Sequence, residues 1–226
     1  MEYIWLHDQS PILEQVSGNF KSAAILLHPF AKMSCNWKQE KNTLLHNYPS
    51  KEQCLISGKA ISWKKIIELT DLCSYEEIAL GLMTSISRFY PEYAREDLAE
   101  KLKGGLDSSF YYTSDDCTSI FLLQKMIEIY EALGVTNIFY GDPISGHKGE
   151  IDISSATPLV LAKIAERECL FIDEHANVAF LSIFDSFTTL LLCKDDNVKQ
   201  LIKHFDLEAI VCDDSTKMGW YFDNNL

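Results

Sequence analysis

The segment 141–152 holds the residues best suited to chemistry in this chain of 226 residues. It reads Gly-Asp-Pro-Ile-Ser-Gly-His-Lys-Gly-Glu-Ile-Asp and follows a predicted strand, a position from which loops commonly face ligands. Its carboxylates, imidazole and amine would suit a small ligand or a divalent cation. The candidate ligand-binding residues are Asp142, His147, Lys148, Glu150 and Asp152. A solvated connecting loop is the competing interpretation of this segment.

The same segment departs from the glycine-rich motifs that bind cofactors. A phosphate-binding loop needs Gly-x-x-x-x-Gly-Lys-Ser/Thr at the start of a helix, and a dinucleotide site needs Gly-x-Gly-x-x-Gly. The chain contains neither pattern, and it also lacks the Gly-x-Ser-x-Gly of a nucleophilic serine. We therefore expect no cofactor and leave open whether the chain is an enzyme.

A second polar cluster, Asp173-Glu174-His175, ends another predicted strand. Carboxylates and imidazole together can bind a metal ion. However, consecutive side chains on a strand point to opposite faces, and His175 with Asn177 is typical of a turn. Turn chemistry is the preferred interpretation here. Cys73, before a predicted helix, is likewise interpreted as structural.

The charge is the most unusual feature of the composition. The chain has 20 Lys and Arg against 33 Asp and Glu, a formal charge of −13. Binding to nucleic acid depends on basic residues that neutralise phosphates, so we expect no nucleic-acid partner. Residues 1–112 carry 14 acidic and 12 basic side chains, whereas residues 113–226 carry 19 and 8, a net charge of −11. The acidic half suits either a basic protein partner or a solvated surface.

The compartment follows from the N-terminus and the cysteines. The first residues have no basic start and no apolar run of signal-peptide length, and the apolar runs elsewhere are too short to cross a membrane. Seven cysteines, never spaced as Cys-x-x-Cys, indicate reduced thiols. We expect a cytoplasmic protein with no membrane partner, and these patterns leave its oligomeric state open.

The elements that must position these residues differ between the two halves. In the first half we predict a short strand over Ala23–Leu27, followed by an irregular stretch over 34–60 with at most one short helix. We then predict three helices: one from about Ile61, one after Ser74, and one over Glu96–Lys103 that ends at Gly104-Gly105. Apolar residues spaced three and four apart indicate the helices, and Ser74-x-x-Glu77 has the pattern of a capping box. His28 lies at the end of the predicted strand.

In the second half, helices and strands alternate. We predict helices from Ser114 or Asp115 to Leu133, from Thr157 to Glu168 and from Asp195 or Asp196 to Phe205. We predict strands over Val135–Tyr140, Leu170–Asp173, Val178–Ile183 and Phe187–Cys193. A final hairpin is expected to join Ala209–Cys212 with Trp220–Phe222. Short connections between consecutive strands require antiparallel pairing.

These elements predict an α+β fold. We expect a mainly helical part over 1–112 and, over 113–226, a mostly antiparallel sheet with helices on one face. The two parts are expected to form one compact unit over 1–226.

Three short motifs point to a family. Ile25–Phe30, Phe184–Phe187 and Cys212–Asp214 with the following Trp220 resemble a family of uncharacterised proteins from bacilli, in which one domain of unknown function covers nearly the whole chain. The resemblance implies a bacterial cytoplasmic protein and carries no catalytic residues to transfer. The acidic second half is also similar in style to immunity proteins, which neutralise secreted bacterial toxins. The sequence therefore favours an acidic protein-binding module, with a ligand-binding or metal-binding enzyme that uses 141–152 as the alternative.

Overall fold

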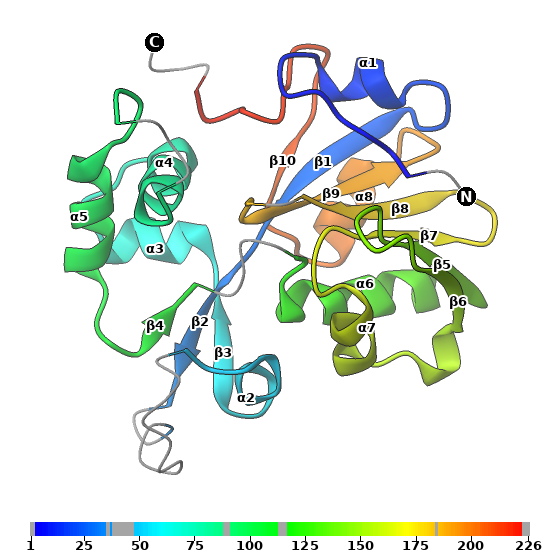
Figure 1. Cartoon of the computed structure of the whole chain (residues 1–226), viewed down its shortest axis with the longest axis horizontal. Helices are drawn as coiled ribbons and strands as arrows, with labels where there is room; N and C mark the ends of the chain where they lie inside the picture. The colour runs from blue at the N-terminus through cyan, green and yellow to red at the C-terminus, as the bar shows by residue number, and fades with distance from the viewer. Residues whose placement is uncertain are drawn as a thin grey trace. The chain divides into compact units, whose positions relative to one another are not determined.

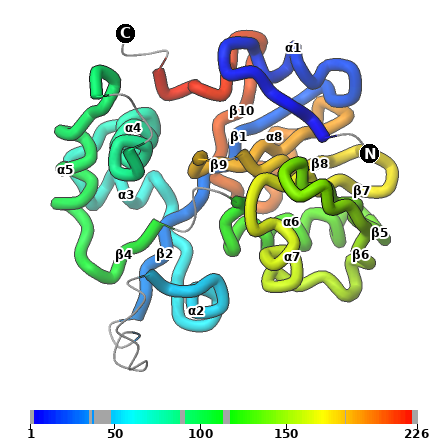
Figure 2. The backbone as a smooth tube through the Cα atoms, viewed as in Figure 1, coloured from blue at the N-terminus to red at the C-terminus, as the bar shows by residue number. Residues whose placement is uncertain are grey.

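The chain forms two structural units in the computed structural model shown in Figures 1 and 2. The structure describes residues 3–34, 37, 48–87, 91–112, 117–183 and 185–222. The larger unit contains residues up to His28 and from 114 to Trp220, and the smaller unit contains Pro29 to 113 together with the residues from Tyr221 onward. The first 28 residues thus lie with the C-terminal half, and the predicted subdomains 1–112 and 113–226 stay a prediction. One compact unit over the whole chain stays a prediction.

The larger unit is built on a seven-stranded antiparallel sheet in the order β10-β1-β9-β8-β7-β5-β6. Its strands are β1 Ser22–Leu27, β5 Asn137–Gly141, β6 Lys148–Asp152, β7 Leu170–Asp173, β8 Val178–Ser182, β9 Thr188–Cys193 and β10 Ala209–Val211. The predicted α+β class and the antiparallel pairing are confirmed. Figure 1 shows the blue β1 inserted among orange and red strands that come from the other end of the chain.

Both faces of this sheet are covered at its centre. Every residue of β1, β8 and β9 is buried, although alternate side chains point to opposite faces. In Figure 1 the sheet lies between α1, Ile12–Val16, on one side and α6 and α7 on the other. The prediction of helices on one face is therefore wrong, because a sheet whose strands are apolar on both faces needs a cover on each.

Three further helices complete the larger unit, with a 3₁₀ turn, η1, over Ile153–Ser155. The helices are α6 Ile120–Ala132, α7 Pro158–Ile164 and α8 Val198–His204. Thr157 caps α7 as predicted, since its hydroxyl accepts a hydrogen bond from the Val160 amide, but this helix ends before Glu168. Gly134 follows α6 with a φ of 70°, which is the left-handed stop expected there.

Two predicted helix starts and the last hairpin need correction. Helix α6 begins after Ser119, later than predicted, and the suggested caps Ser114 and Asp115 lie outside the described residues. Helix α8 follows Asn197 in place of Asp195 or Asp196. Strand β10 pairs with β1, and Trp220–Phe222 forms a turn, so no terminal hairpin exists there. Pairing with β1 buries more apolar surface than an isolated hairpin could.

The smaller unit has a sheet that the sequence reasoning missed. Strands β3, β2 and β4 form an antiparallel sheet in that order, over Gly58–Ile61, Phe30–Met33 and Phe110–Tyr111. Helix α2, Lys51–Ser57, provides the short helix expected between 34 and 60, while residues 35–36 and 38–47 lie outside the described part. The description of this half as mainly helical is thus only partly right.

Helices α3 Trp63–Leu69, α4 Tyr75–Ser85 and α5 Glu96–Gly105 confirm the three predicted helices of the smaller unit. Ser74 caps α4 as predicted, because its hydroxyl accepts a hydrogen bond from the Glu77 amide. The Glu77 carboxylate accepts a hydrogen bond from the Cys73 amide, whereas a capping box would use the Ser74 amide. The two glycines after Lys103 lie within α5 and not after it. A Cβ at Gly105 would lie 2.7 Å from the Thr70 side chain, so close packing requires this glycine.

Candidate functional site

The predicted segment 141–152 is a β-hairpin at one side of the larger sheet. Strands β5 and β6 pair along it, and Asp142 lies at the start of its turn. The Asp142 carboxylate accepts hydrogen bonds from the Ile144 and Ser145 amides at 2.8 and 3.1 Å and from the Ser145 hydroxyl at 2.6 Å. Burial alone would raise the pKa of Asp142, but these hydrogen bonds outweigh it and lower the pKa. Asp142 therefore stabilises the turn.

The other candidates are spread along this hairpin. His147 is exposed in the turn, and Lys148, Glu150 and Asp152 are exposed along β6. Asp152 lies at the far end of β6 from Asp142, and it accepts hydrogen bonds from the amide and hydroxyl of Ser154. Within the described parts of the chain, no three His, Cys, Asp or Glu side chains are grouped to hold a metal ion. A ligand role for these five residues stays a prediction.

The Asp173-Glu174-His175 cluster forms the turn between β7 and β8. Asp173 is 2% exposed, and its carboxylate accepts hydrogen bonds from three backbone amides of the same turn. Glu174 accepts hydrogen bonds from the Thr136 and Asn137 amides, both at 2.9 Å. The geometry agrees with the turn interpretation of this cluster.

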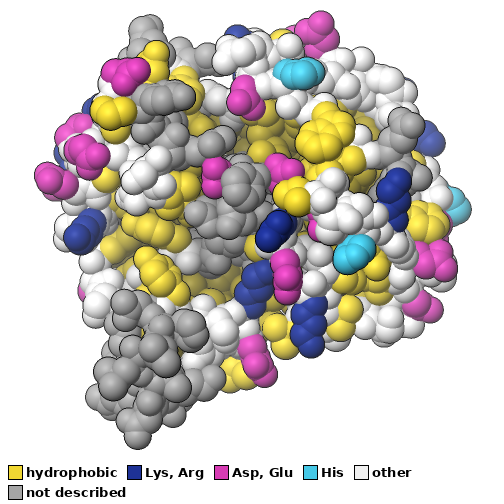
Figure 3. Space-filling model, viewed as in Figure 1, with side chains coloured by type: hydrophobic (Ala, Val, Ile, Leu, Met, Phe, Trp, Pro, Cys, Tyr) yellow, Lys and Arg dark blue, Asp and Glu magenta, His cyan; other side chains and the backbone are white. Residues whose placement is uncertain are grey.

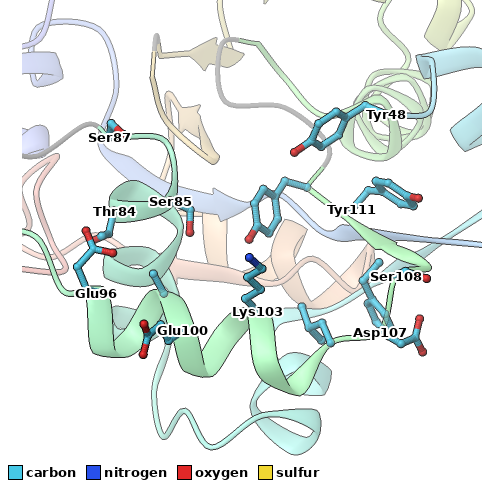
Figure 4. A pocket seen from close by; sticks show the side chains of 14 residues that line it. Tyr48, Thr84, Ser85, Ser87, Glu96, Glu100, Lys103, Asp107, Ser108 and Tyr111 are labelled. Carbon is cyan, nitrogen blue, oxygen red and sulfur yellow. The ribbon is translucent and has the colours of Figure 1, made fainter. Parts of the chain in front are cut away.

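A cavity lies in the smaller unit, where the sequence reasoning proposed no site. It has a volume of about 910 Å³ and lies among the end of α4, one face of α5 and the chain around β4 (Figure 4). The lining residues are Tyr48, Thr84, Ser85, Ser87, Glu96, Ala99, Glu100, Lys103, Leu106, Asp107, Ser108, Phe110, Tyr111 and Tyr112.

Helix α5 provides three of the four charged side chains of this pocket, and Asp107, after the helix, is the fourth. Glu96, Glu100 and Lys103 follow one another at spacings of four and three residues, so the helix presents them on one face. In Figure 4, Lys103 extends from α5 toward the space below Tyr48 and Tyr111. Among the described residues, none of these three side chains forms an ion pair. Helix α5 therefore offers an ammonium and two carboxylates to a ligand, while the Asp107 carboxylate accepts hydrogen bonds from Ser109.

Tyrosines line the opposite side of the pocket. Tyr48 is 64% exposed, and its ring meets the edge of the buried Tyr111 ring at a centroid distance of 6.0 Å. Tyr112 packs against Phe30 at 5.6 Å. Burial raises the pKa of Tyr112, while a hydrogen bond with Ser85 opposes that shift, so its hydroxyl stays protonated near neutral pH. These rings offer apolar faces and hydroxyl groups to a ligand.

The end of α4 closes the pocket with small polar side chains. The Thr84 hydroxyl accepts a hydrogen bond from the Arg95 amide, and the Ser85 hydroxyl donates to the Gly81 carbonyl. Ser87 adopts a φ of 57°, a left-handed conformation that is uncommon for serine. Backbone strain of this kind is often found beside binding sites.

One signal in the sequence could have revealed this pocket. The spacing of Glu96, Glu100 and Lys103 on a correctly predicted helix marks a charged face. Nothing local, however, indicated that Tyr48 would lie across from that face, because it is about 50 residues before α5, or that the chain after α5 would turn back to place Tyr111 there.

On the face of each unit seen in Figure 3, Asp and Glu side chains are interspersed with other residues. None of the helices in the described ranges combines the length and apolar character needed to cross a bilayer.

Comparison with known proteins agrees with the family resemblance. Residues 8–222 match the family described as "Protein of unknown function (DUF2711)". The chain is 38% identical over 223 residues to "Uncharacterized protein YwbB" of Bacillus subtilis (strain 168), covering 98% of this chain and 99% of that protein. No solved structure matches the chain. The chain is therefore a bacterial member of the DUF2711 family of proteins of unknown function.

Proposed function

We propose that the pocket of the smaller unit binds a small amphoteric molecule with a ring, of the size and chemistry of an amino acid. The observation that carries this proposal is the α5 face, on which Glu100 and Lys103 line the pocket without an ion-pair partner among the described residues.

The spacing of the charges supports a ligand that carries both signs. Glu100 and Lys103 are separated by three residues, a rise of about 4.5 Å along a helix. An α-amino acid head group carries an ammonium and a carboxylate within a similar reach. Such a ligand would pair its ammonium with Glu100 and its carboxylate with Lys103, so neither charge of the ligand would be left unpaired on leaving water.

The tyrosines support a ring on that ligand. Aromatic rings pack favourably at centroid distances of roughly 4.5–7 Å, and an ammonium near a ring face gains a cation–π interaction. Tyr48 is exposed and lies against Tyr111, so it can change its contacts when a ligand enters. The hydroxyls of the α4 end add hydrogen-bonding groups.

Three matched probes test the proposal by calorimetry and thermal shift. Phenylalanine has both charges, phenethylamine has the ammonium alone, and 3-phenylpropionate has the carboxylate alone. We expect phenylalanine to bind most tightly, with each single-charge probe about tenfold weaker or more. Glu100→Gln should remove the advantage given by the ammonium and Lys103→Gln that given by the carboxylate. Glu131→Gln, an exposed change on α6, serves as the control. Equal binding of the three probes, or no binding of any, would contradict the proposal.

Binding of a basic protein partner, including an immunity-like role, is a separate proposal that rests on the net charge of −11 in residues 113–226. Its weakness is that Asp142, Asp152, Asp173 and Asp213 accept hydrogen bonds from their own turns, while Glu174 accepts hydrogen bonds from the Thr136 and Asn137 amides. Turn formation therefore accounts for part of that acidity. Affinity capture at low and high salt tests this role, since a complex held by charge must dissociate as salt rises.

A further inference from the structure

Strand β6 is the last strand of the larger sheet in the described part of the chain. Hydrogen bonds join the Asp142 amide to the His147 carbonyl and the Ile153 amide to the Thr136 carbonyl. In an antiparallel pair, the residues that bond the neighbouring strand alternate along the chain. Residues 147, 149, 151 and 153 therefore face β5, and the backbone groups of Lys148, Glu150 and Asp152 point away from the sheet.

The side chains at this edge are self-complementary. Lys148 and Glu150 are exposed, two residues apart and on the same face of the sheet. When two copies of β6 lie antiparallel with a two-fold axis at Gly149, Lys148 of each copy lies opposite Glu150 of the other. In this register the outward N–H and C=O groups of Lys148 in one copy face those of Glu150 in the other copy, as a hydrogen-bonded pair requires.

We propose that a second copy of this chain docks on β6, so that the two seven-stranded sheets join into one through a two-fold axis at Gly149. Charge selects this register. An axis at Glu150 would pair Lys148 with Asp152 but would also place the two Glu150 carboxylates opposite each other, which is destabilising. The Gly149 axis has two pairs of opposite charge and none of like charge.

The environment of Gly149 agrees with this axis. A Cβ at this position would collide with the Tyr140 hydroxyl and ring, so the tyrosine lies across the glycine. Residues opposite each other in a non-hydrogen-bonded pair approach closely, with Cα atoms about 4.5 Å apart. Two glycines at the axis leave room for the Tyr140 rings of both copies, and their contact would add apolar area to the joint.

The charges on β6 also explain why other strands would be rejected. Charged side chains on edge strands commonly prevent pairing with foreign strands. Here Lys148 is followed on the same face by two acidic residues, Glu150 and Asp152, so only the axis at Gly149 gives pairs of opposite charge without a pair of like charge. The edge is thus protected from general association while it accepts its own copy.

Sedimentation velocity on the full chain, over a range of concentrations, tests the dimer with charge-swap variants. We expect a monomer–dimer equilibrium that weakens with salt. Lys148→Glu and Glu150→Lys should each raise the dimer dissociation constant about tenfold or more, since each turns two attractive pairs into repulsive ones. The double swap, K148E with E150K, restores the pairs and should restore the dimer.

Glu166→Lys, an exposed reversal away from β6, is the matched control and should leave the dimer unchanged. Circular dichroism confirms that each variant is folded. A monomer at every concentration, a dimer that tolerates both single reversals, or a double swap that fails to restore association would each overturn the proposal. The outcome is independent of ligand binding in the smaller unit.

Discussion

Removal of the Asp173 carboxylate should strongly destabilise the larger unit. Asp173 is buried, and its two oxygens accept hydrogen bonds from the His175 and Asn177 amides at 2.8 Å and from the Val178 amide at 2.5 Å. The same turn contains Ala176 with a φ of 52°, a conformation that alanine seldom adopts without support. Asp173 thus holds the connection between β7 and β8.

The magnitude follows from the number of hydrogen bonds lost. A hydrogen bond to a charged group contributes about 1.5–3 kcal/mol, and a buried amide left without an acceptor adds a desolvation penalty. Asp173→Asn retains one accepting oxygen and should cost about 2 kcal/mol in the free energy of unfolding. Asp173→Ala removes all three hydrogen bonds and should cost about 4.5 kcal/mol or more, a fall of roughly 9–18 °C or more in the Tm of the larger unit.

Urea unfolding followed by far-UV circular dichroism measures both variants. Glu131→Gln, an exposed change on α6 of the same unit, is the matched control, and its cost should stay below about 1 kcal/mol. The metal-ligand interpretation of this cluster predicts instead that a chelator lowers the Tm of the unchanged protein. An Asp173→Ala variant within about 1 kcal/mol of the unchanged protein would refute the reasoning.

Three further predictions concern packing and thiols. Gly105→Ala should destabilise the smaller unit by about 1–3 kcal/mol, because the added Cβ would collide with the chain at residues 69–70. At Gly104 an added Cβ has nothing within 4 Å, so Gly104→Ala should stabilise α5 slightly. Paired thermal unfolding curves of the two variants measure this difference. Mass mapping after brief alkylation at pH 8 should find Cys73 modified and Cys169 and Cys193 protected; rapid modification of the latter two would contradict their burial. Burial raises the pKa of both Cys169 and Cys193 from 9.0 to about 12, so these thiols ionise first in the unfolded chain, and the free energy of unfolding should fall as the pH rises from 9 toward 12. A Cys193→Ala variant should show a shallower fall in denaturant titrations across that range, and an unchanged slope would count against this account.

Elements governed by local rules were predicted well. Strand β7 has the predicted bounds Leu170–Asp173, and Ser74 and Thr157 cap α4 and α7 as expected. Alternation, capping and turn chemistry each depend on residues within a few positions of one another, so the sequence contains the whole signal. The failures at the starts of α6 and α8 were also local: each had more than one polar residue able to precede the helix, and packing of the apolar face chose among them.

The candidate site shows the same division. The 141–152 segment was correctly placed after a strand, but its Asp142 and Asp152 carboxylates serve local turns at opposite ends of β6. The pocket of the smaller unit was missed, because it combines the charged face of α5 with the distant Tyr48 and with Tyr111 on the strand that follows α5.

What could be known from the chain alone was therefore its class, its charge, its family resemblance and most of its individual helices and strands. Only the folded structure decided which elements meet: that β1 lies between β9 and β10, that β2, β3 and β4 form a second sheet, and that α5 faces the tyrosines. The physical reason is that an apolar strand needs partners to satisfy its backbone and cover both its faces, but its own residues do not specify which strands those are. That choice depends on the burial of the whole unit, and with it comes the position of every site built from separate segments.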